Sequence, residues 1–172
     1  MLYSIFEGAK MIKKATKQNI IDFMSTAKTI SEDAKDYFKK KFIDGLENKS
    51  KTIYVSCEND SDLLVAIINQ NDYDNSYNLI DAKTAYLIYV SHDEKKINEQ
   101  RFKDLLKYAE QDLKKIGFEN FTIGVDISYV NDLKVIFNYG FSTFVKYSFR
   151  PLKDQNDYKN NALIAYYKKN LI

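Results

Sequence analysis

The sequence predicts an α/β (α+β) fold in which a mixed, mostly antiparallel sheet of about six to seven strands is flanked by helices. Three observations predict it. A strand-like run, a long amphipathic helix and a second strand-like run follow one another between residues 85 and 127. Paired strand-like runs precede that segment, and two more follow it without any internal repeat. At 172 residues, the chain has the size of one domain with a substantial core.

Two helices are expected in the N-terminal part of the chain. Thr16 is the expected N-cap of the first helix, and Ser31 is the expected N-cap of the second. Acidic residues open the second helix and Lys39 to Lys41 lie near its expected end, as the helix dipole favours. Gly45 is expected to close this helix, because glycine accepts the conformation of a helix end at little cost.

Strand-like runs outside the central segment form two pairs. Residues 52–57 and 63–68 are joined by a short polar turn and predict an antiparallel hairpin. Residues 141–149 and 163–167 predict two further strands, separated by a polar stretch. Residues 69–83 form a long polar connection, which is either a loop on the substrate side or a mobile segment.

The central segment carries the clearest functional signal. Its first strand is the apolar run Ala85 to Val90, and the alternating residues 121–127 form its second strand. Between them a helix is expected over about 98–116, and Gly117 ends it. The apolar face of this helix consists of Phe102, Leu105, Leu106, Ala109, Leu113 and Ile116. A strand, a turn and a helix N-terminus followed by a parallel strand form a geometry that binds phosphate through backbone N–H groups. The segment therefore predicts a phosphate-bearing ligand.

Composition narrows the class of protein. The net charge is only +2, and lysines alternate with acidic residues along the helices, which disfavours a nucleic-acid surface. No apolar stretch has the length of a membrane span. Cys57 is the single cysteine, so no intrachain disulfide can form, and the reducing cytoplasm is the simplest expected location.

Several segments together resemble the GNAT N-acetyltransferase superfamily. Residues 104–118 are similar to the helix that follows the family's acetyl-CoA pyrophosphate loop. Residues 121–125 resemble the family's fifth strand, and residues 131–141 resemble its Asn-to-Gly-Phe helix. Residues 11–16 resemble its first strand and helix cap. The order and spacing of these segments imply a GNAT-like fold for most of the chain.

The resemblance implies where the domain begins and ends, and it shows at which positions this chain differs from the family's pattern. A single GNAT-like domain is expected over residues 11–172, with residues 1–10 as an N-terminal extension or an added first strand. The family's loop pattern is Arg/Gln-x-x-Gly-x-Gly/Ala. Ile97, Gln100 and Phe102 occupy its three defined positions, so both glycines are absent. Side chains at the glycine positions are expected to hinder a close approach of the backbone to phosphate.

The resemblance implies acetyl-CoA as cosubstrate, without a metal ion. In the family, the pantetheine arm lies between the opened fourth and fifth strands, which places it here beside Tyr89, Val90 and Ser91. The helix N-terminus holds the pyrophosphate, and basic side chains there are expected to compensate for the lost glycines. The other residues expected to bind the cofactor are Lys96, Ile97, Asn98, Gln100, Arg101, Phe102, Lys103, Asn131 and Phe137. The alternative is that the basic residues among them are ordinary solvated residues of a helix start, and that Asn131 is an ordinary helix cap.

Proton transfer has two candidate residues. The family often places a tyrosine, which protonates the departing thiolate, at the position of Ile136. Tyr139 is the nearby replacement, unless it is only a core aromatic residue beside Gly140. His92 is the sole histidine and follows the strand expected to carry the thioester, so it is a candidate base, unless it is only an exposed turn residue.

Two functions follow from the resemblance. The first is an acetyl-CoA-dependent N-acetyltransferase in which an amine attacks the thioester directly. The amine would belong to a small molecule or a protein, and the sequence leaves a homodimer open. The second is a catalytically inactive GNAT-like module that binds CoA or a protein partner, because the loop glycines and the usual tyrosine are absent.

Overall fold

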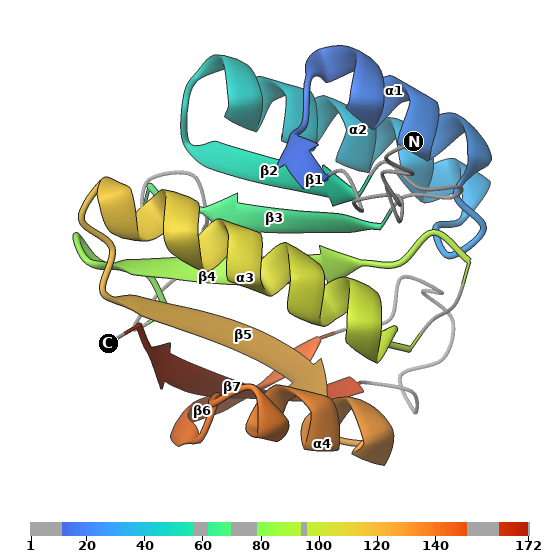
Figure 1. Ribbon diagram of the computed structural model, residues 1–172. Coiled ribbons are helices and arrows are strands. Elements are labelled where there is room, and N and C mark those ends of the chain that lie inside the picture. The colour runs from blue at the N-terminus through green and yellow to red at the C-terminus, as the bar shows by residue number, and fades with distance from the viewer. Residues whose placement is uncertain (1–11, 57–61, 70–78, 94–95, 151–161, 172) are drawn as a thin grey trace, which may run out of the picture.

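The computed structural model describes residues 12–56, 62–69, 79–93, 96–150 and 162–171, which form one seven-stranded sheet with four helices (Figure 1). The strand order across the sheet is β1-β2-β3-β4-β5-β7-β6. The strands are β1 (Ile12–Lys14), β2 (Lys51–Ser56), β3 (Leu63–Ile67), β4 (Thr84–Val90), β5 (Asn120–Asp126), β6 (Thr143–Arg150) and β7 (Ala162–Asn170). The helices are α1 (Lys17–Thr26), α2 (Glu32–Glu47), α3 (Glu99–Lys115) and α4 (Val130–Asn138).

The pairing of the strands confirms the predicted mixed sheet. β4 and β5 are parallel neighbours connected by α3, and every other neighbouring pair in the described sheet is antiparallel. β2 and β3 form the predicted hairpin, and β6 and β7 are the predicted C-terminal pair. The expected polar turn at 57–61, residues 70–78 and 151–161 of the two expected polar connections, and the expected extension 1–10 lie outside the described residues.

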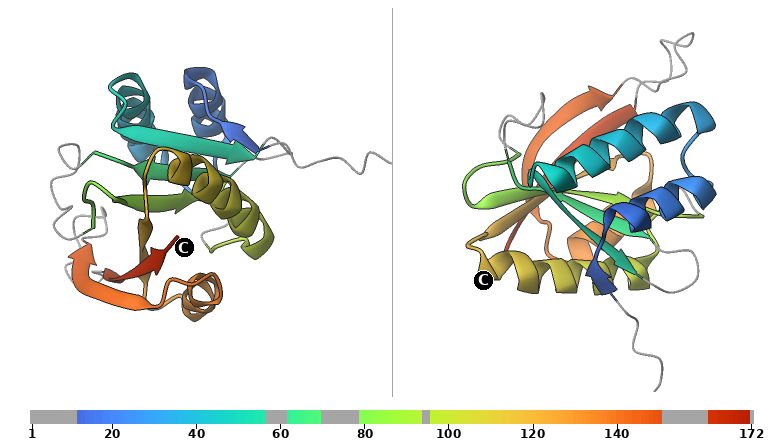
Figure 2. Two further views of the ribbon diagram at one scale, coloured as in Figure 1. Left: turned by 60° about the vertical axis from the view of Figure 1, so that its left-hand side comes forward. Right: turned by 90° about the horizontal axis from the view of Figure 1, so that it is seen from above.

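Helices cover both faces of the sheet (Figure 2). On one face, α3 and α4 pack on the odd-numbered side chains of β4 and β5, such as Leu87 and Ile123. On the opposite face, α1 and α2 pack on alternate residues such as Tyr86 and Ile164. Because successive side chains of a strand point to opposite faces, each central strand contributes to both cores. Burial on both sides explains why β3 is apolar at all five of its positions.

The ends of the helices follow local sequence signals in most cases. Thr16 caps α1 in a capping box with Asn19, as predicted for the cap. Gly117 follows α3 with a φ of 101°, a conformation that glycine adopts without steric cost. Ser31 occupies the N-cap position of α2, although its side chain makes no capping hydrogen bond.

The prediction for the end of α2 is wrong. The helix continues through Gly45 to Glu47, so Lys39 to Lys41 lie in its middle rather than near its end. Gly45 serves packing instead. A Cβ atom at this position would lie 2.4 Å from Cδ of Lys51, the first residue of β2. The glycine therefore makes room for a buried lysine side chain, a contact between distant residues that local signals do not reveal.

Candidate functional site

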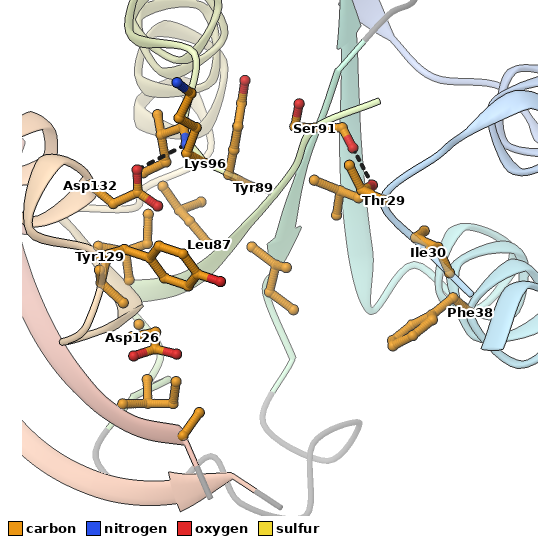
Figure 3. A pocket seen from close by; sticks show the side chains of 18 of the residues that line it. Thr29, Ile30, Phe38, Leu87, Tyr89, Ser91, Lys96, Asp126, Tyr129 and Asp132 are labelled. Carbon is orange, nitrogen blue, oxygen red and sulfur yellow. Dashed lines mark hydrogen bonds between the residues drawn. The ribbon is translucent and has the colours of Figure 1, made fainter. Parts of the chain in front are cut away.

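A cleft opens where the parallel strands β4 and β5 diverge. Their paired register runs from Thr84 and Asn120 to Leu87 and Ile123 and does not continue beyond that pair. From there β4 remains paired with β3, and β5 remains paired with β7. The gap between the strands belongs to a cleft of about 570 Å³ that side chains of several elements line (Figure 3).

The cleft reaches both faces of the sheet. Tyr89, Ile97 and Asp132 line it on the face that carries α3 and α4. Ile88 and Phe38 line it on the face that carries α1 and α2. A molecule threaded between the strands would therefore contact two separate environments, one on each side of the sheet.

The N-terminus of α3 is capped by groups of the protein itself. Asn98 is the N-cap residue, and its side chain accepts a hydrogen bond from the Arg101 N–H at 3.1 Å. The Ile97 N–H donates to Oδ1 of Asp132 at 2.9 Å. The Phe102 N–H donates to the Asn98 carbonyl oxygen at 2.9 Å. The Phe102 bond is the first ordinary bond of the helix, whereas the acceptors of Ile97 and Arg101 are side chains, and the sequence did not reveal the acceptor of Ile97.

Asp62 connects three elements beside this helix end. It is completely buried, and it accepts hydrogen bonds from the Tyr89 hydroxyl and from the His92 N–H. Arg101 Nη1 lies 3.4 Å from its Oδ1. Burial, followed by the charge of Asp62, raises the pKa of Tyr89. Because a buried carboxylate needs charged and hydrogen-bonding partners, the Arg101 guanidinium has a structural role that the sequence prediction did not include.

The residues predicted to bind the cofactor fall into three groups. Those that line the cleft are Tyr89, Val90, Ser91, Lys96 and Ile97. Those at the start of α3 are its N-cap residue Asn98 and, on its first turns, Gln100, Arg101, Phe102 and Lys103. Those on α4 are Asn131 and Phe137.

Not all of these side chains face a surface that a ligand can reach. Phe102 is completely buried, where its ring packs against Tyr89 and Tyr139, so it contributes to the core. Gln100 donates to Asp104 at the surface of α3. Phe137 packs edge-on against the ring of Tyr167 but stays 44% exposed, so a ligand could still reach it. The alternative interpretation of Asn131 as a helix cap is wrong, because Tyr129 is the N-cap residue of α4.

His92 lies beside α1 and is not among the residues that line the cleft. It is only 4% exposed, so the alternative of an exposed turn histidine is wrong. Nε2 lies 2.8 Å from the Thr26 hydroxyl oxygen, and Nδ1 lies 3.0 Å from Oδ1 of Asp93. The ring also packs edge-on against Phe23. These contacts hold the end of β4 to α1, and a catalytic role for His92 stays a prediction.

Tyr139 is the C-cap residue of α4 and packs against the core through Phe102. Its hydroxyl donates to Glu99 Oε1 at 3.4 Å. Burial, followed by the charge of Glu99, raises the pKa of Tyr139. Ile136, which stands at the usual position of the tyrosine, is completely buried. Tyr139 therefore points to the first turn of α3, and its role as a proton donor also stays a prediction.

Asp126, Tyr129 and Asp132 are among the polar residues that line the cleft and that sequence reasoning did not single out. The Tyr129 side chain extends across the cleft with its hydroxyl toward the gap (Figure 3). Burial raises the pKa of Asp132, and the hydrogen bond from Ile97 partly opposes this change. The available signal was positional for two of them, because Asp126 lies at the end of the predicted strand 121–127 and Tyr129 follows that strand closely, whereas Asp132 lies in the helix expected over 131–141.

Comparisons with solved structures identify the fold. The chain is similar to a candidate acetyltransferase of the GNAT family from Desulfovibrio desulfuricans, with 9% identity, a TM-score of 0.64, and coverage of 94% of this chain and 99% of that one. It is similar to an N-acetyltransferase from Staphylococcus aureus, with 16% identity, a TM-score of 0.61, and coverage of 94% and 98%. It also matches a candidate acetyltransferase from Salmonella typhimurium, solved with its cofactor acetyl-CoA, with 10% identity, a TM-score of 0.63, and coverage of 94% of each chain.

These likenesses establish a GNAT-like fold for this chain. No protein-family model matches the sequence, and no curated protein matches it either. In the part of the chain that the structure describes, none of the helices combines the length and the apolar character required to cross a membrane.

Proposed function

We propose that this protein is an acetyl-CoA-dependent N-acetyltransferase. The observation that carries the proposal is the separation of β4 from β5 beyond Leu87 and Ile123, within a fold whose solved neighbours are acetyltransferases. A pantetheine arm contains amide groups, and an opened strand edge offers backbone N–H and C=O groups with which such amides can pair. Tyr89 to Ser91 line the corresponding part of the cleft, which supports the pantetheine position expected from the sequence.

The chemistry that fits this cleft is direct transfer. The neutral nitrogen of an amine attacks the thioester carbonyl carbon, and a C–N bond forms as the C–S bond breaks. The amine loses one proton, and the departing thiolate gains one proton to become the CoA thiol. Holding both reactants in the cleft makes the attack effectively unimolecular, which is the main contribution available to such a site. General acid–base assistance adds on the order of 10²–10⁴-fold.

Three residues are candidates for the proton transfers. Tyr139 and His92 are predicted from the sequence, and Tyr129 is added because its hydroxyl points toward the gap between the strands (Figure 3). Substitution of Tyr139 or Tyr129 by phenylalanine removes one hydroxyl, and His92→Gln retains much of the side chain's size. We expect at least one of these variants to lower kcat by ~10-fold or more without much change in the affinity for CoA, the signature of a role in the transition state.

The second candidate function is an inactive module that binds CoA or a protein partner. It is favoured by the N–H groups of Ile97 and Arg101, which are already hydrogen-bonded to side chains of the protein where the pyrophosphate is expected. It is also favoured by the buried Ile136 at the usual position of the tyrosine.

Calorimetric titration with acetyl-CoA, CoA and pantetheine tests the proposal. Saturable binding of acetyl-CoA, followed by thiol release in the presence of amines, supports the transferase. Binding of CoA without turnover of any amine supports the inactive module. The cofactor proposal is contradicted if protein that is folded by circular dichroism binds none of the three compounds.

A further inference from the structure

The half of the cleft on the α1–α2 side is lined mostly by apolar side chains and contains a carboxylate, that of Asp126. Asp126 ends β5 and pairs with Ile164 of β7, and directly paired residues of antiparallel strands share a face. Ile164 belongs to the core beneath α1 and α2. Asp126 therefore lies on the α1–α2 face, opposite to the face that carries Lys96 and Asp132.

The wall of this half is mainly apolar. One side of α2 contributes Ala34 and Phe38, which lie four residues apart and thus on the same helical face. Ile88 of β4 and Ile164 of β7 continue the apolar surface, and Ile30 extends it ahead of α2. Figure 3 shows Ile30 and Phe38 across the cleft from Asp126. Phe38 and Ile30 are only partly buried, so the described chain leaves part of their apolar surface uncovered.

Charge is sparse on this side. Among the described residues that line the α1–α2 half, Asp126 is the one charged side chain. Its Oδ1 accepts hydrogen bonds from the Ser128 N–H at 2.9 Å and from the Ser128 hydroxyl at 2.7 Å. These two bonds hold the carboxylate at the end of β5, and within the described residues its Oδ2 makes no hydrogen bond. A carboxylate fixed through one oxygen leaves the second oxygen able to pair with a cation.

We propose that the acceptor is a monoamine whose amino group is attached to an apolar, aliphatic or aromatic, body. This inference rests on the proposed acetyl transfer. The ammonium group pairs with Asp126, and the apolar body lies against Phe38, Ile30 and Ile88. Before attack the ammonium group loses one proton to solvent, and the free amine then reacts at the thioester. Polyamines and amino sugars fit poorly, because their further charges and hydroxyl groups need polar partners that this wall largely lacks.

A panel of three amines tests the substrate class. The probes are 2-phenylethylamine, spermidine and an aminoglycoside, each titrated against the full chain with and without CoA and each assayed for thiol release with acetyl-CoA. We expect 2-phenylethylamine to have a kcat/KM ~10-fold or more above that of the other two. The proposal is overturned if spermidine or the aminoglycoside is preferred, or if CoA binds and 2-phenylethylamine neither binds nor reacts.

Two pairs of variants test the residues. Asp126→Asn is expected to raise the KM or Kd of 2-phenylethylamine by ~10-fold while the Kd of CoA stays unchanged, and Asp36→Asn, on an exposed carboxylate of α2, is its control. Phe38→Ala is expected to weaken the binding of the same amine by ~10-fold. Phe149→Ala, on an exposed aromatic residue of β6, is its control. Equal effects of variant and control would overturn the assignment.

The two proposals can fail separately. If 2-phenylethylamine binds, Asp126→Asn weakens that binding and no acetyl transfer occurs, the amine site stands and the transferase function fails. If transfer occurs with hydrophilic amines alone, the transferase function stands and the apolar acceptor is wrong.

Discussion

Replacing the buried lysine at the start of β2 should stabilise the protein. Lys51 is 4% exposed and packs against Gly45 of α2. Burial, together with the nearby Lys41, lowers the pKa of Lys51 to about 8 from an ordinary value of 10.5. The folded protein therefore disfavours the charged form of this side chain. Lys51→Met keeps an unbranched side chain of similar length and removes the charge.

The size of the effect follows from the shift in pKa. One pKa unit corresponds to ~1.4 kcal/mol, so the full shift corresponds to ~3 kcal/mol. Lys51 also lines a second cavity of about 240 Å³, and the charge of Asp44 partly opposes the lowering of its pKa. We therefore expect Lys51→Met to raise the free energy of unfolding by roughly 1–2 kcal/mol near pH 7.

The pH dependence has a definite sign. Between the folded pKa of about 8 and the ordinary value of 10.5, the unfolded chain binds more protons at this site than the folded chain does. Stability of the parent should consequently rise with pH through this window, while the penalty is fully present below it. The advantage of Lys51→Met should shrink over the same window.

Urea unfolding followed by circular dichroism, at about pH 7 and about pH 9.5, measures both effects. Lys40→Met, which removes the charge of an exposed lysine on α2, is the control and should change stability little at either pH. The reasoning is refuted if Lys51→Met is no more stable than the parent near pH 7, or if its advantage does not decline as the pH rises.

Three further predictions concern the cleft and its supports. Lys103→Glu should weaken CoA binding by ~5-fold or more, as seen by calorimetry, because charge-assisted contacts are worth on the order of 1.5–3 kcal/mol; an equal effect of Lys107→Glu, further along α3, would argue against a pyrophosphate site at the helix start. Gly124→Ala should lower the urea midpoint, because its Cβ would lie 2.6 Å from the ring of Tyr166; an unchanged midpoint would show that this ring moves freely. Asp132→Ala should lower the free energy of unfolding by ~1–3 kcal/mol, because it leaves the Ile97 N–H without its acceptor. Asp132→Asn should lower it less, since the amide keeps an acceptor oxygen. Equal losses of unfolding free energy in the two variants would contradict this role of Asp132.

The local structure of the site was largely predictable from the sequence. The apolar run of β4, the amphipathic stripe of α3 and the glycine after it specify elements whose signals lie within a few residues of each other. Residues 89 to 91, 96 and 97, which the sequence predicted beside the cofactor, line the cleft, because their position along the chain follows directly from the end of β4. Their binding of a cofactor stays a prediction. The chain order of strand, helix and strand also predicted the parallel pair, since such crossovers have one dominant geometry.

Partners from distant parts of the chain were not predictable. Arg101 was predicted as a phosphate ligand, yet its guanidinium meets the buried carboxylate of Asp62, which lies 39 residues away. Asp132 reaches the N–H of Ile97 across 35 residues. Such pairs depend on how strands and helices are packed against each other, and no periodic signal in a single sequence records them.

What the sequence by itself determined is therefore the set of elements, their order and the edge of the sheet at which a ligand would meet them. Only the tertiary structure decided which side chains are available there. It buried Phe102 in the core, placed His92 against α1, and brought Asp126 and Tyr129 to the opening between β4 and β5. The physical reason is that hydrophobic periodicity and capping act over one or two turns of chain, whereas the direction and the partners of a polar side chain are set by the three-dimensional packing around it.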